Sequence, residues 1–243
     1  MRQVAFITGA SGDIGRAIAV QLAKDGYAVA LGFNNNEKAA NSLSAQLKEA
    51  GYEAFAVACD ISDNGSIQSA VSLIGKELGS ICVLVNNAGI ADIKLFTDNS
   101  FSELQKMINT DLLGAMELSR QVLPEMIRQK KGCIVNIASV WGEKGASCEV
   151  AYSAAKAGLI GFTKALAREE GPSGVRVNCV SCGFIDTKMN SSLSQEDKTA
   201  VIDEVASSRA GTPQDIANAV SFLVSDKADY INGQILRVDG CWI

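Results

Sequence analysis

Three side chains between residues 139 and 156 could carry out acid–base chemistry on a carbonyl group. Tyr152 follows Ser139 by thirteen positions, and Lys156 follows Tyr152 by four. A helix beginning near Val150 would place the tyrosine and the lysine one turn apart on the same face. A phenol has an ordinary pKa of about 10, and a nearby ammonium lowers this pKa by stabilising the phenolate. This spacing suits a tyrosine that transfers a proton, a lysine that tunes its pKa and a serine, Ser139, that holds the substrate oxygen. Taken alone, Tyr152 and Lys156 could equally be two side chains of an ordinary helix, so the other motifs must decide between the two interpretations.

Apolar runs and amphipathic segments alternate along the chain and predict the elements that must position these side chains. The runs predict strands at 4–7, 28–32, 53–58, 81–85, 133–138, 176–180 and 235–238. The segments predict helices at about 14–25, 36–50, 62–78 (capped by Ser62), 101–129, 150–170 and 215–225. This alternation predicts an α/β fold, a single doubly wound Rossmann domain over residues 1–243. Its parallel sheet would have about seven strands with helices on both faces.

A glycine-rich turn joins the first predicted strand to the first predicted helix. Glycines in this context let the backbone approach a pyrophosphate, which the free N–H groups of the helix start can bind. We predict a dinucleotide site here, formed by Gly9, Ser11, Gly12, Asp13, Ile14 and Gly15.

The end of the second strand predicts which dinucleotide binds. Dinucleotide folds that prefer NAD usually place an acid there to bind the ribose 2′-hydroxyl. Here Asn34 and Asn35 follow the strand, and no acid precedes Glu37. A 2′-phosphate would meet no repulsion and could accept from the amides. This pattern favours NADP(H) over NAD(H).

Composition excludes several function classes. The chain has 243 residues, 47% of them hydrophobic, and a net charge of -5, which disfavours nucleic acid and anionic membranes as main partners. We find no run of about 18 apolar residues and no signal-peptide pattern at the start, so we expect no membrane span and a cytoplasmic location. Because the chain has no histidine, a Ser-His-Asp hydrolase is excluded.

The seven cysteines predict free thiols rather than a metal or redox site. Cys59, Cys82, Cys133 and Cys179 lie in apolar runs, where a thiol behaves as a small hydrophobe. Cys179 and Cys182 form a CxxC pair, but a zinc site needs a second ligand pair. A redox pair would open a helix, whereas this one ends a strand. We predict no metal site.

Taken together, the motifs resemble those of the short-chain dehydrogenase/reductase family in its classical branch. They fall in the family's order over essentially the whole chain: Thr8-Gly9, Gly12, Gly15, Asp60, Asn86-Asn87-Ala88-Gly89, Ser139, Tyr152-x-x-x-Lys156 and Gly183 to Thr187. The stretches AYSAAKAGLIGFTKALARE and GFIDTKM are most similar to bacterial 3-oxoacyl-[acyl-carrier-protein] reductases.

The resemblance implies a role for each motif. Ser139 would polarise the carbonyl oxygen, Tyr152 would protonate it as hydride arrives from NADPH, and Lys156 would also bind the nicotinamide ribose. Asp60 would bind the adenine edge. The full cofactor set would comprise the glycine turn with Asn34, Asn35, Asp60, Ile61, Asn87, Ala88, Gly89, Tyr152, Lys156, Gly183, Ile185 and Thr187.

Each of these polar residues also has an ordinary structural alternative. Asp60 could cap the helix that starts nearby, Asn86 and Asn87 could be turn residues at a strand end, and Thr187 could be a helix N-cap. For each residue taken alone, the structural alternative stays open. For all of them together to be structural, the residues would have to fall in the family's order by coincidence.

Four positions depart from the family pattern. Asp13 lies where the family has its middle glycine, and we expect its side chain to point away from the pyrophosphate. Asp111 takes the place of a catalytic Asn, and we expect it to preserve a proton relay to Lys156. Cys182 replaces a proline, so we expect a looser loop and a thiol open to oxidation. Gly12 also replaces a basic residue found in many NADP-preferring relatives, which weakens that preference.

These inferences predict an NADPH-dependent reductase of 3-oxoacyl thioesters, with a substrate lid at 187–210 and a homotetrameric assembly. Arg128, Lys130 and Lys131 could bind an acidic acyl carrier protein, or simply be solvated cations at a helix end. Two other functions stay open. The chain could oxidise or reduce another alcohol or ketone, such as a sugar or steroid, or it could be a cofactor-binding regulatory protein with impaired chemistry.

Overall fold

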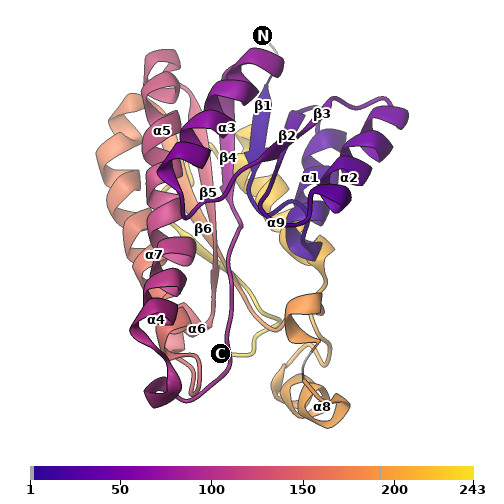
Figure 1. Cartoon of the computed structure of the whole chain (residues 1–243), viewed down its shortest axis with the longest axis vertical. Helices are drawn as coiled ribbons and strands as arrows, with labels where there is room; N and C mark the ends of the chain where they lie inside the picture. The colour runs from indigo at the N-terminus through magenta and orange to yellow at the C-terminus, as the bar shows by residue number, and fades with distance from the viewer. Residues whose placement is uncertain (1–2, 192) are drawn as a thin grey trace.

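A single sheet of seven parallel strands forms the centre of the computed structural model, which describes residues 3–191 and 193–243. The strand order is β3-β2-β1-β4-β5-β6-β7. The strands are β1 (Val4–Ile7), β2 (Ala28–Phe33), β3 (Ala54–Ala58), β4 (Ile81–Asn86), β5 (Gly132–Ser139), β6 (Val175–Cys182) and β7 (Ile235–Val238). Helices cover both sides of this sheet (Figure 1). The predicted doubly wound α/β architecture is confirmed.

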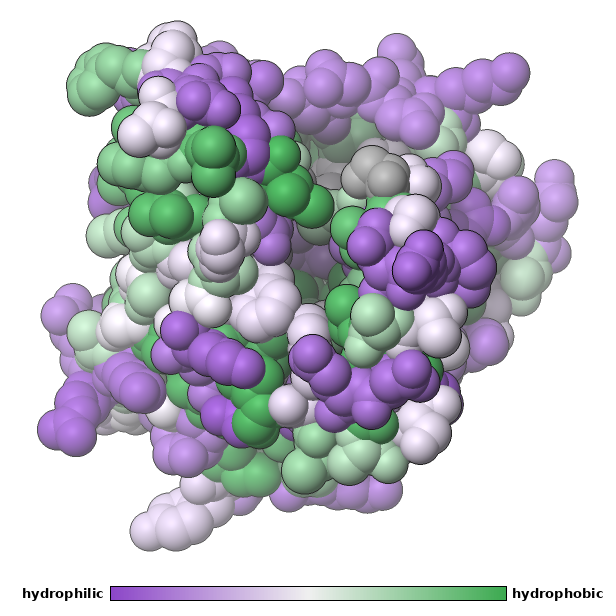
Figure 2. Space-filling model, turned by 90° about the horizontal axis from the view of Figure 1, so that it is seen from below, coloured by the Kyte–Doolittle hydropathy of each residue, from purple (hydrophilic) through white to green (hydrophobic). Residues whose placement is uncertain are grey.

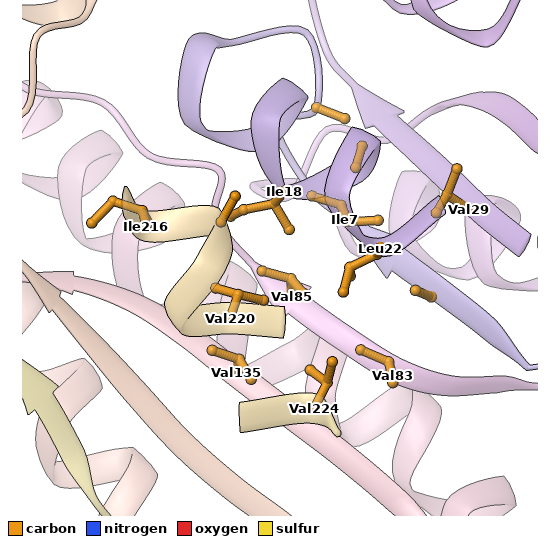
Figure 3. Close-up of a cluster of buried hydrophobic side chains, with 14 of the residues drawn as sticks. Ile7, Ile18, Leu22, Val29, Val83, Val85, Val135, Ile216, Val220 and Val224 are labelled. Atoms are coloured by element: carbon orange, nitrogen blue, oxygen red, sulfur yellow. The ribbon is translucent and has the colours of Figure 1, made fainter. Parts of the chain in front are cut away.

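One face of the sheet is covered by α1 (Asp13–Lys24), α2 (Glu37–Glu49) and α9 (Pro213–Val224). Ile18 and Leu22 of α1 and Val220 of α9 lie beside Val85 and Val135 of the central strands (Figure 3). The central strands are buried on both faces, which explains why they read as continuous apolar runs rather than as an alternation.

The opposite face is covered by α3 (Asn64–Glu77), α5 (Gly114–Gln129) and α7 (Val150–Glu170). Leu118 and Met126 of α5 and Ile74 of α3 are almost fully buried against strand residues such as Phe6 and Leu84. The N-cap of α3 is Asp63, whose carboxylate accepts hydrogen bonds from the N–H groups of the first turn. The prediction that Ser62 caps this helix was wrong by one residue.

The helix predicted over 101–129 is interrupted by a π-helical turn. It consists of α4 (Phe101–Ile108), η2 (Asn109–Leu113) and α5. Immediately after the turn, Gly114 packs against the Ile61 carbonyl so closely that a Cβ at this position would collide with it. A π-turn widens the helix by one residue and often marks a functional position. Asp111 lies in this turn.

The remaining elements are short and lie mostly beyond the strand ends. They are η1 (Phe96–Asp98), α6 (Trp141–Lys144), η3 (Gly171–Ser173), η4 (Lys188–Asn190), α8 (Gln195–Glu204) and η5 (Asp226–Ala228). Helix α8, which lies in the predicted lid, stands apart from the sheet (Figure 1) and buries none of its residues. Over the described ranges, the structure has no helix with the length and apolarity needed to cross a bilayer.

A buried chain of polar side chains ties the two central strands to the helices. Asn86 Nδ2 donates to Asn136 Oδ1 at 2.8 Å and to Ser119 Oγ at 3.1 Å, and Asn136 Nδ2 donates to Thr163 Oγ1 at 2.9 Å. These bonds connect β4, β5, α5 and α7. Buried polar groups must be paired, so they fix how the ends of β4 and β5 lie relative to α7. This contact gives Asn86 a structural role.

We predict that Asn136→Ala destabilises the fold by about 1–3 kcal/mol, because Asn86 and Thr163 lose their buried partner. Urea unfolding would measure the change. Asn41→Ala is the matched control, since this side chain is exposed and makes a single long bond of 3.4 Å to Glu37. Equal stability of the two variants would contradict the prediction.

Candidate active site

Thr8 joins the loops that follow β1 and β4. Its Oγ1 accepts hydrogen bonds from the N–H groups of Asn87 and Ala88, both at 3.0 Å. Asn87 Nδ2 in turn donates to the Thr8 carbonyl at 2.8 Å and to the Gly9 carbonyl at 3.3 Å. The structure therefore brings Asn87 and Ala88 against the glycine turn, as the predicted cofactor set requires.

The glycine turn forms a cradle that other residues could not form. Gly9 has φ +64°, and a Cβ there would lie 3.0 Å from the Ala88 Cα. A Cβ on Gly15 would collide with the Gly9 carbonyl. The turn leads into α1, whose N-cap is Gly12 and has no side-chain cap. The first N–H groups of α1 are left for an anion, which fits a dinucleotide pyrophosphate.

Asp13 turns its side chain towards the segment after β6. Its Oδ2 accepts from the backbone N–H of Lys188 at 2.7 Å, across 175 positions of sequence. This contact gives the acid at the start of α1 a definite partner, so the carboxylate links the glycine turn to the predicted lid.

Asn34 and Asp60 lie together at the ends of β2 and β3. Asp60 Oδ1 accepts from Ser62 Oγ at 2.6 Å and from Ser62 N at 2.9 Å. The Ser62 hydroxyl, the Ser62 N–H and the Asn34 side chain together lower the pKa of Asp60. Asp60 does not cap α3, because Asp63 does so. Asn34 and Asn35 are exposed, whereas Ile61 is buried in the core.

The segment after β6 continues alongside the loop that precedes α9. Gly183 N donates to the Val238 carbonyl, and a Cβ at Gly183 would lie 2.6 Å from the Asp239 Cα. Ile185 is buried and pairs with Gly211. Thr187 occupies the N-cap position of η4, but its side chain makes no capping hydrogen bond. Thr187 is therefore at the N-cap position, but its hydroxyl does not cap the helix.

Ser139, Tyr152 and Lys156 meet where β5 ends and α7 begins. Ser139 is the last residue of β5, and its Oγ accepts from the Trp141 N–H at 3.2 Å. Tyr152 and Lys156 share one face of α7, and Lys156 Nζ lies 5.4 Å from the centre of the tyrosine ring. The one-turn relationship predicted from their spacing is thus present in the structure.

Asp111 approaches the same lysine from the π-turn. Its Oδ2 lies 3.1 Å from Lys156 Nζ, and its Oδ1 accepts from the Ile90 N–H at 2.8 Å. Lys156 also donates to the Ile137 carbonyl at 3.3 Å. A Cβ at Gly89 would lie 2.6 Å from Asp111 Oδ2, so the glycine leaves room for the carboxylate.

The charges around Tyr152 act in opposite directions. Burial raises the pKa of Tyr152, the Lys156 ammonium lowers it, and the Asp111 carboxylate raises it again. Burial alone would lower the pKa of Lys156, but Asp111 and Tyr152 raise it above its ordinary value. Lys156 therefore stays an ammonium at neutral pH.

The Cys179 and Cys182 thiols lie inside the protein at the end of β6. Burial raises the pKa of each to about 12. Because only the thiolate is readily oxidised, the expectation that Cys182 is open to oxidation was wrong. Among the described residues, no group of three or more Cys, Asp or Glu side chains is arranged to hold a metal ion.

Comparison with known proteins identifies the family to which this chain belongs. Residues 3–198 match the family model described as short chain dehydrogenase. The chain belongs to the short-chain dehydrogenase family. It is 42% identical over 243 residues to the uncharacterized oxidoreductase YmfI of Bacillus subtilis, covering 100% of this chain and 99% of that protein.

Two further relatives have named activities. The chain is 41% identical over 238 residues to the 3-oxoacyl-[acyl-carrier-protein] reductase FabG of Escherichia coli, covering 98% and 96% of the two chains. A crystal structure of a proposed gluconate dehydrogenase from Agrobacterium tumefaciens superposes with a TM-score of 0.95 at 30% identity, covering 99% and 95%. Family membership makes this chain an oxidoreductase of the NAD(P)-binding kind, and the glycine cradle fits that cofactor.

A cavity of about 330 Å³ opens beside Tyr152 of this short-chain dehydrogenase. Its lining comes from the loop between β4 and α4, from α4 itself and from the start of α7 with the two residues before it. It includes Ile90, Asp92, Lys106, Met107, Cys148 and Glu149. The face at which the strands end is visibly hollowed, with hydrophobic side chains along one rim (Figure 2). The size is at the lower end for a small-molecule site.

The C-terminal residues connect helix α6, which follows Ser139, to helix α8. The Trp141 and Trp242 rings meet edge to face with centroids 4.8 Å apart, and Trp242 Nε1 donates to Glu204 Oε2 at 3.1 Å. Asp239 accepts from the N–H groups of the last three residues. This connection gives the predicted lid a contact with the segment that follows Ser139.

Sequence reasoning named Thr8 in a family motif without giving it a role, and it did not assign Trp141 or Glu149 to the site. Thr8 precedes the predicted glycine turn directly, so its position at a strand end was a usable signal. Trp141 begins the short helix α6 and Glu149 directly precedes α7, in a stretch whose sequence shows no hydrophobic periodicity. Only the packing of that segment against α7 places them near Tyr152.

We predict that Gly15→Ala weakens NADPH binding by at least about tenfold, equivalent to about 1.4 kcal/mol. The added Cβ would push α1 away from the Gly9 carbonyl and distort the cradle. Fluorescence titration with NADPH would measure the loss. Gly75→Ala is the control, because this position in α3 has open space around it. Unchanged NADPH affinity in Gly15→Ala would contradict the assignment of the cradle.

Proposed function

We propose that this short-chain dehydrogenase is an NADPH-dependent carbonyl reductase that reduces 3-oxoacyl thioesters to 3-hydroxyacyl thioesters in fatty acid synthesis. The observation that supports the carbonyl chemistry best is the meeting of Ser139, Tyr152 and Lys156 at one strand end. The similarity to named 3-oxoacyl-[acyl-carrier-protein] reductases over nearly the full length supports the substrate class.

In this proposal each residue has a distinct task. The Ser139 hydroxyl holds and polarises the carbonyl oxygen, and Tyr152 donates its proton to that oxygen. Lys156 stabilises the resulting phenolate, and Asp111 forms an ion pair with the lysine. The cofactor, when bound, supplies the hydride. The tyrosine lies on the wall of the cavity, so a substrate in the cavity is within reach of its proton.

The cofactor would lie across the strand ends, at the topological switch point beside β1 and β4. The cradle from Gly9 to Gly15 would hold the pyrophosphate. Asp60 and Ile61, together with Asn87, Ala88 and Gly89, would border the adenosine half. Tyr152, Lys156, Gly183, Ile185 and Thr187 would border the nicotinamide half, and Asn34 and Asn35 would favour a 2′-phosphate.

Carrier-protein binding, the lid and assembly are further parts of the proposal. Arg128 forms an ion pair with Glu125 at 2.5 Å, which weakens its assignment to an acidic partner and leaves that role to Lys130 and Lys131. Residues 187–210 would close over the substrate. A homotetramer is supported by exposed apolar side chains on and beside the long helices. These are Phe101, Leu113, Met116, Ile127 and Val150. Cytoplasmic location stays a prediction.

A dehydrogenase of another alcohol or ketone is the second candidate. The similarity in fold to a proposed gluconate dehydrogenase favours it, at 30% identity. A cofactor-binding protein with impaired chemistry is less well supported, because the serine, tyrosine and lysine have the mutual arrangement that proton transfer needs.

We predict that the purified protein oxidises NADPH with acetoacetyl-coenzyme A and that Tyr152→Phe lowers the rate at least about a hundredfold, because the proton donor is lost. Loss of NADPH absorbance measures both rates. Tyr230→Phe is the control, since this tyrosine is fully exposed. No turnover of the thioester, together with turnover of a sugar or steroid alcohol, would select the second candidate.

We also predict that Asn35→Asp lowers kcat/KM for NADPH by at least about tenfold, or about 1.4 kcal/mol, and leaves kcat/KM for NADH within about twofold. A carboxylate beside the 2′-phosphate would repel it and could bind a 2′-hydroxyl instead. Initial rates with each cofactor test this. An equal loss of kcat/KM with both cofactors would show that residue 35 does not distinguish a 2′-phosphate from a 2′-hydroxyl.

A further inference from the structure

The Asp111 carboxylate and the Lys156 ammonium form an ion pair in the protein interior. The side chains are 0% and 6% exposed, and 3.1 Å separates Oδ2 from Nζ. An isolated buried charge is costly, whereas two opposite buried charges compensate each other. Lys156 is therefore not a lone cation beside Tyr152, because its charge is half of a nearly neutral pair.

We propose that Asp111 is a positioning residue that fixes the Lys156 ammonium beside Tyr152 and offsets part of its positive charge, so that the pair, rather than the lysine alone, sets the pH dependence of proton transfer. This inference rests on the proposed function in one respect, namely that Tyr152 is the group that transfers the proton.

The position of the carboxylate is fixed independently of the lysine. Asp111 Oδ1 accepts from the Ile90 N–H at 2.8 Å, and Asp111 lies in the π-turn rather than in a regular helix. Gly89 borders both partners: a Cβ there would lie 2.6 Å from Asp111 Oδ2 and 3.3 Å from Lys156 Nζ. The backbone thus holds the carboxylate in place, and the absence of a side chain at position 89 leaves room for the pair.

The other titratable groups around the pair do not replace Asp111. On β6, burial raises the pKa of the Cys179 and Cys182 thiols to about 12, so both are neutral in the working range. From β5, the Ile137 carbonyl accepts from Lys156 at 3.3 Å but carries no net charge. The charged groups in the cavity in front of Tyr152 are Asp92, Glu103, Lys106 and Glu149.

Two of these cavity acids already have a partner. Asp92 and Glu103 both pair with Lys94, at 3.0 Å and 2.7 Å. Asp111 is the carboxylate that contacts Lys156.

The direction of the effect follows from the charges. An ammonium near a phenol favours the phenolate, and a carboxylate beside that ammonium opposes it. Replacing the carboxylate by an amide of the same shape removes the opposition and keeps an oxygen that can accept from the Ile90 N–H. Tyr152 should then ionise at lower pH.

The test is an ultraviolet difference titration of the phenolate in the cofactor-free protein. Subtracting the matching Tyr152→Phe variant isolates Tyr152 from Tyr27, Tyr52 and Tyr230. Asp111→Asn should lower the midpoint by about one pH unit or more, and the pH profile of kcat for thioester reduction should move in the same direction. Asp98→Asn is the matched control, because it removes one negative charge from an exposed position nearby and should leave the midpoint unchanged.

An unchanged or higher midpoint in Asp111→Asn would overturn the inference. If that variant does not fold, as judged by circular dichroism, the unmodified protein provides the second measurement. In that protein, the ionisation midpoint of Tyr152 should lie above the ordinary tyrosine pKa of about 10. A midpoint below about 10 would overturn the inference that Asp111 offsets the charge of Lys156. The titration needs no substrate, so a shifted midpoint without thioester turnover leaves this inference standing and refutes the proposed substrate. Thioester turnover without a shifted midpoint supports the proposed substrate and refutes this inference.

Discussion

The buried ammonium of Lys156 is the interaction on which the arrangement of the site depends. Its neighbours come from three different elements: the Asp111 carboxylate of η2, the Ile137 carbonyl of β5 and the Tyr152 ring of α7. Breaking a buried ion pair typically costs about 3–5 kcal/mol. Each element is therefore held where it can reach the ammonium. This constraint places the tyrosine hydroxyl relative to Ser139, the last residue of β5.

The sequence predicted those parts of the fold that depend on a repeating pattern. Apolar runs located all seven strands, and a spacing of four residues was enough to put Tyr152 and Lys156 on one helical face. The π-turn could not be predicted in this way. It adds only one residue to the helix, so the hydrophobic pattern of 109–113 still resembles that of an ordinary helix. The bond from Lys188 N to Asp13 spans 175 positions and leaves no local signal. The burial of Cys182 likewise depends on tertiary packing, which a single sequence does not show.

The two sides of the site are held with different strength. On the cofactor side, buried hydrogen bonds through Thr8 and Asn87 join the loops after β1 and β4. On the other side, α8 buries none of its residues and is held at its end by the exposed Glu204–Trp242 bond. Segments with few buried contacts open at a lower free energy than the core. The protein thus combines a preformed glycine cradle with an α8 segment that can rearrange.

The C-terminal connection has a practical consequence for following that rearrangement. Of the seven cysteines, all within the described residues, Cys241 alone is exposed. It immediately precedes Trp242, whose indole contacts both Trp141 and Glu204 of α8. Burial raises the pKa of the Cys59, Cys133, Cys179 and Cys182 thiols to about 11–12, which suppresses their reactivity. Once Cys148, which is half-buried in the cavity wall, is replaced by serine, Cys241 offers a reporter position. A fluorophore attached at Cys241 would lie beside two indoles that quench by contact, and its brightness would follow the distance between the chain end and helix α8.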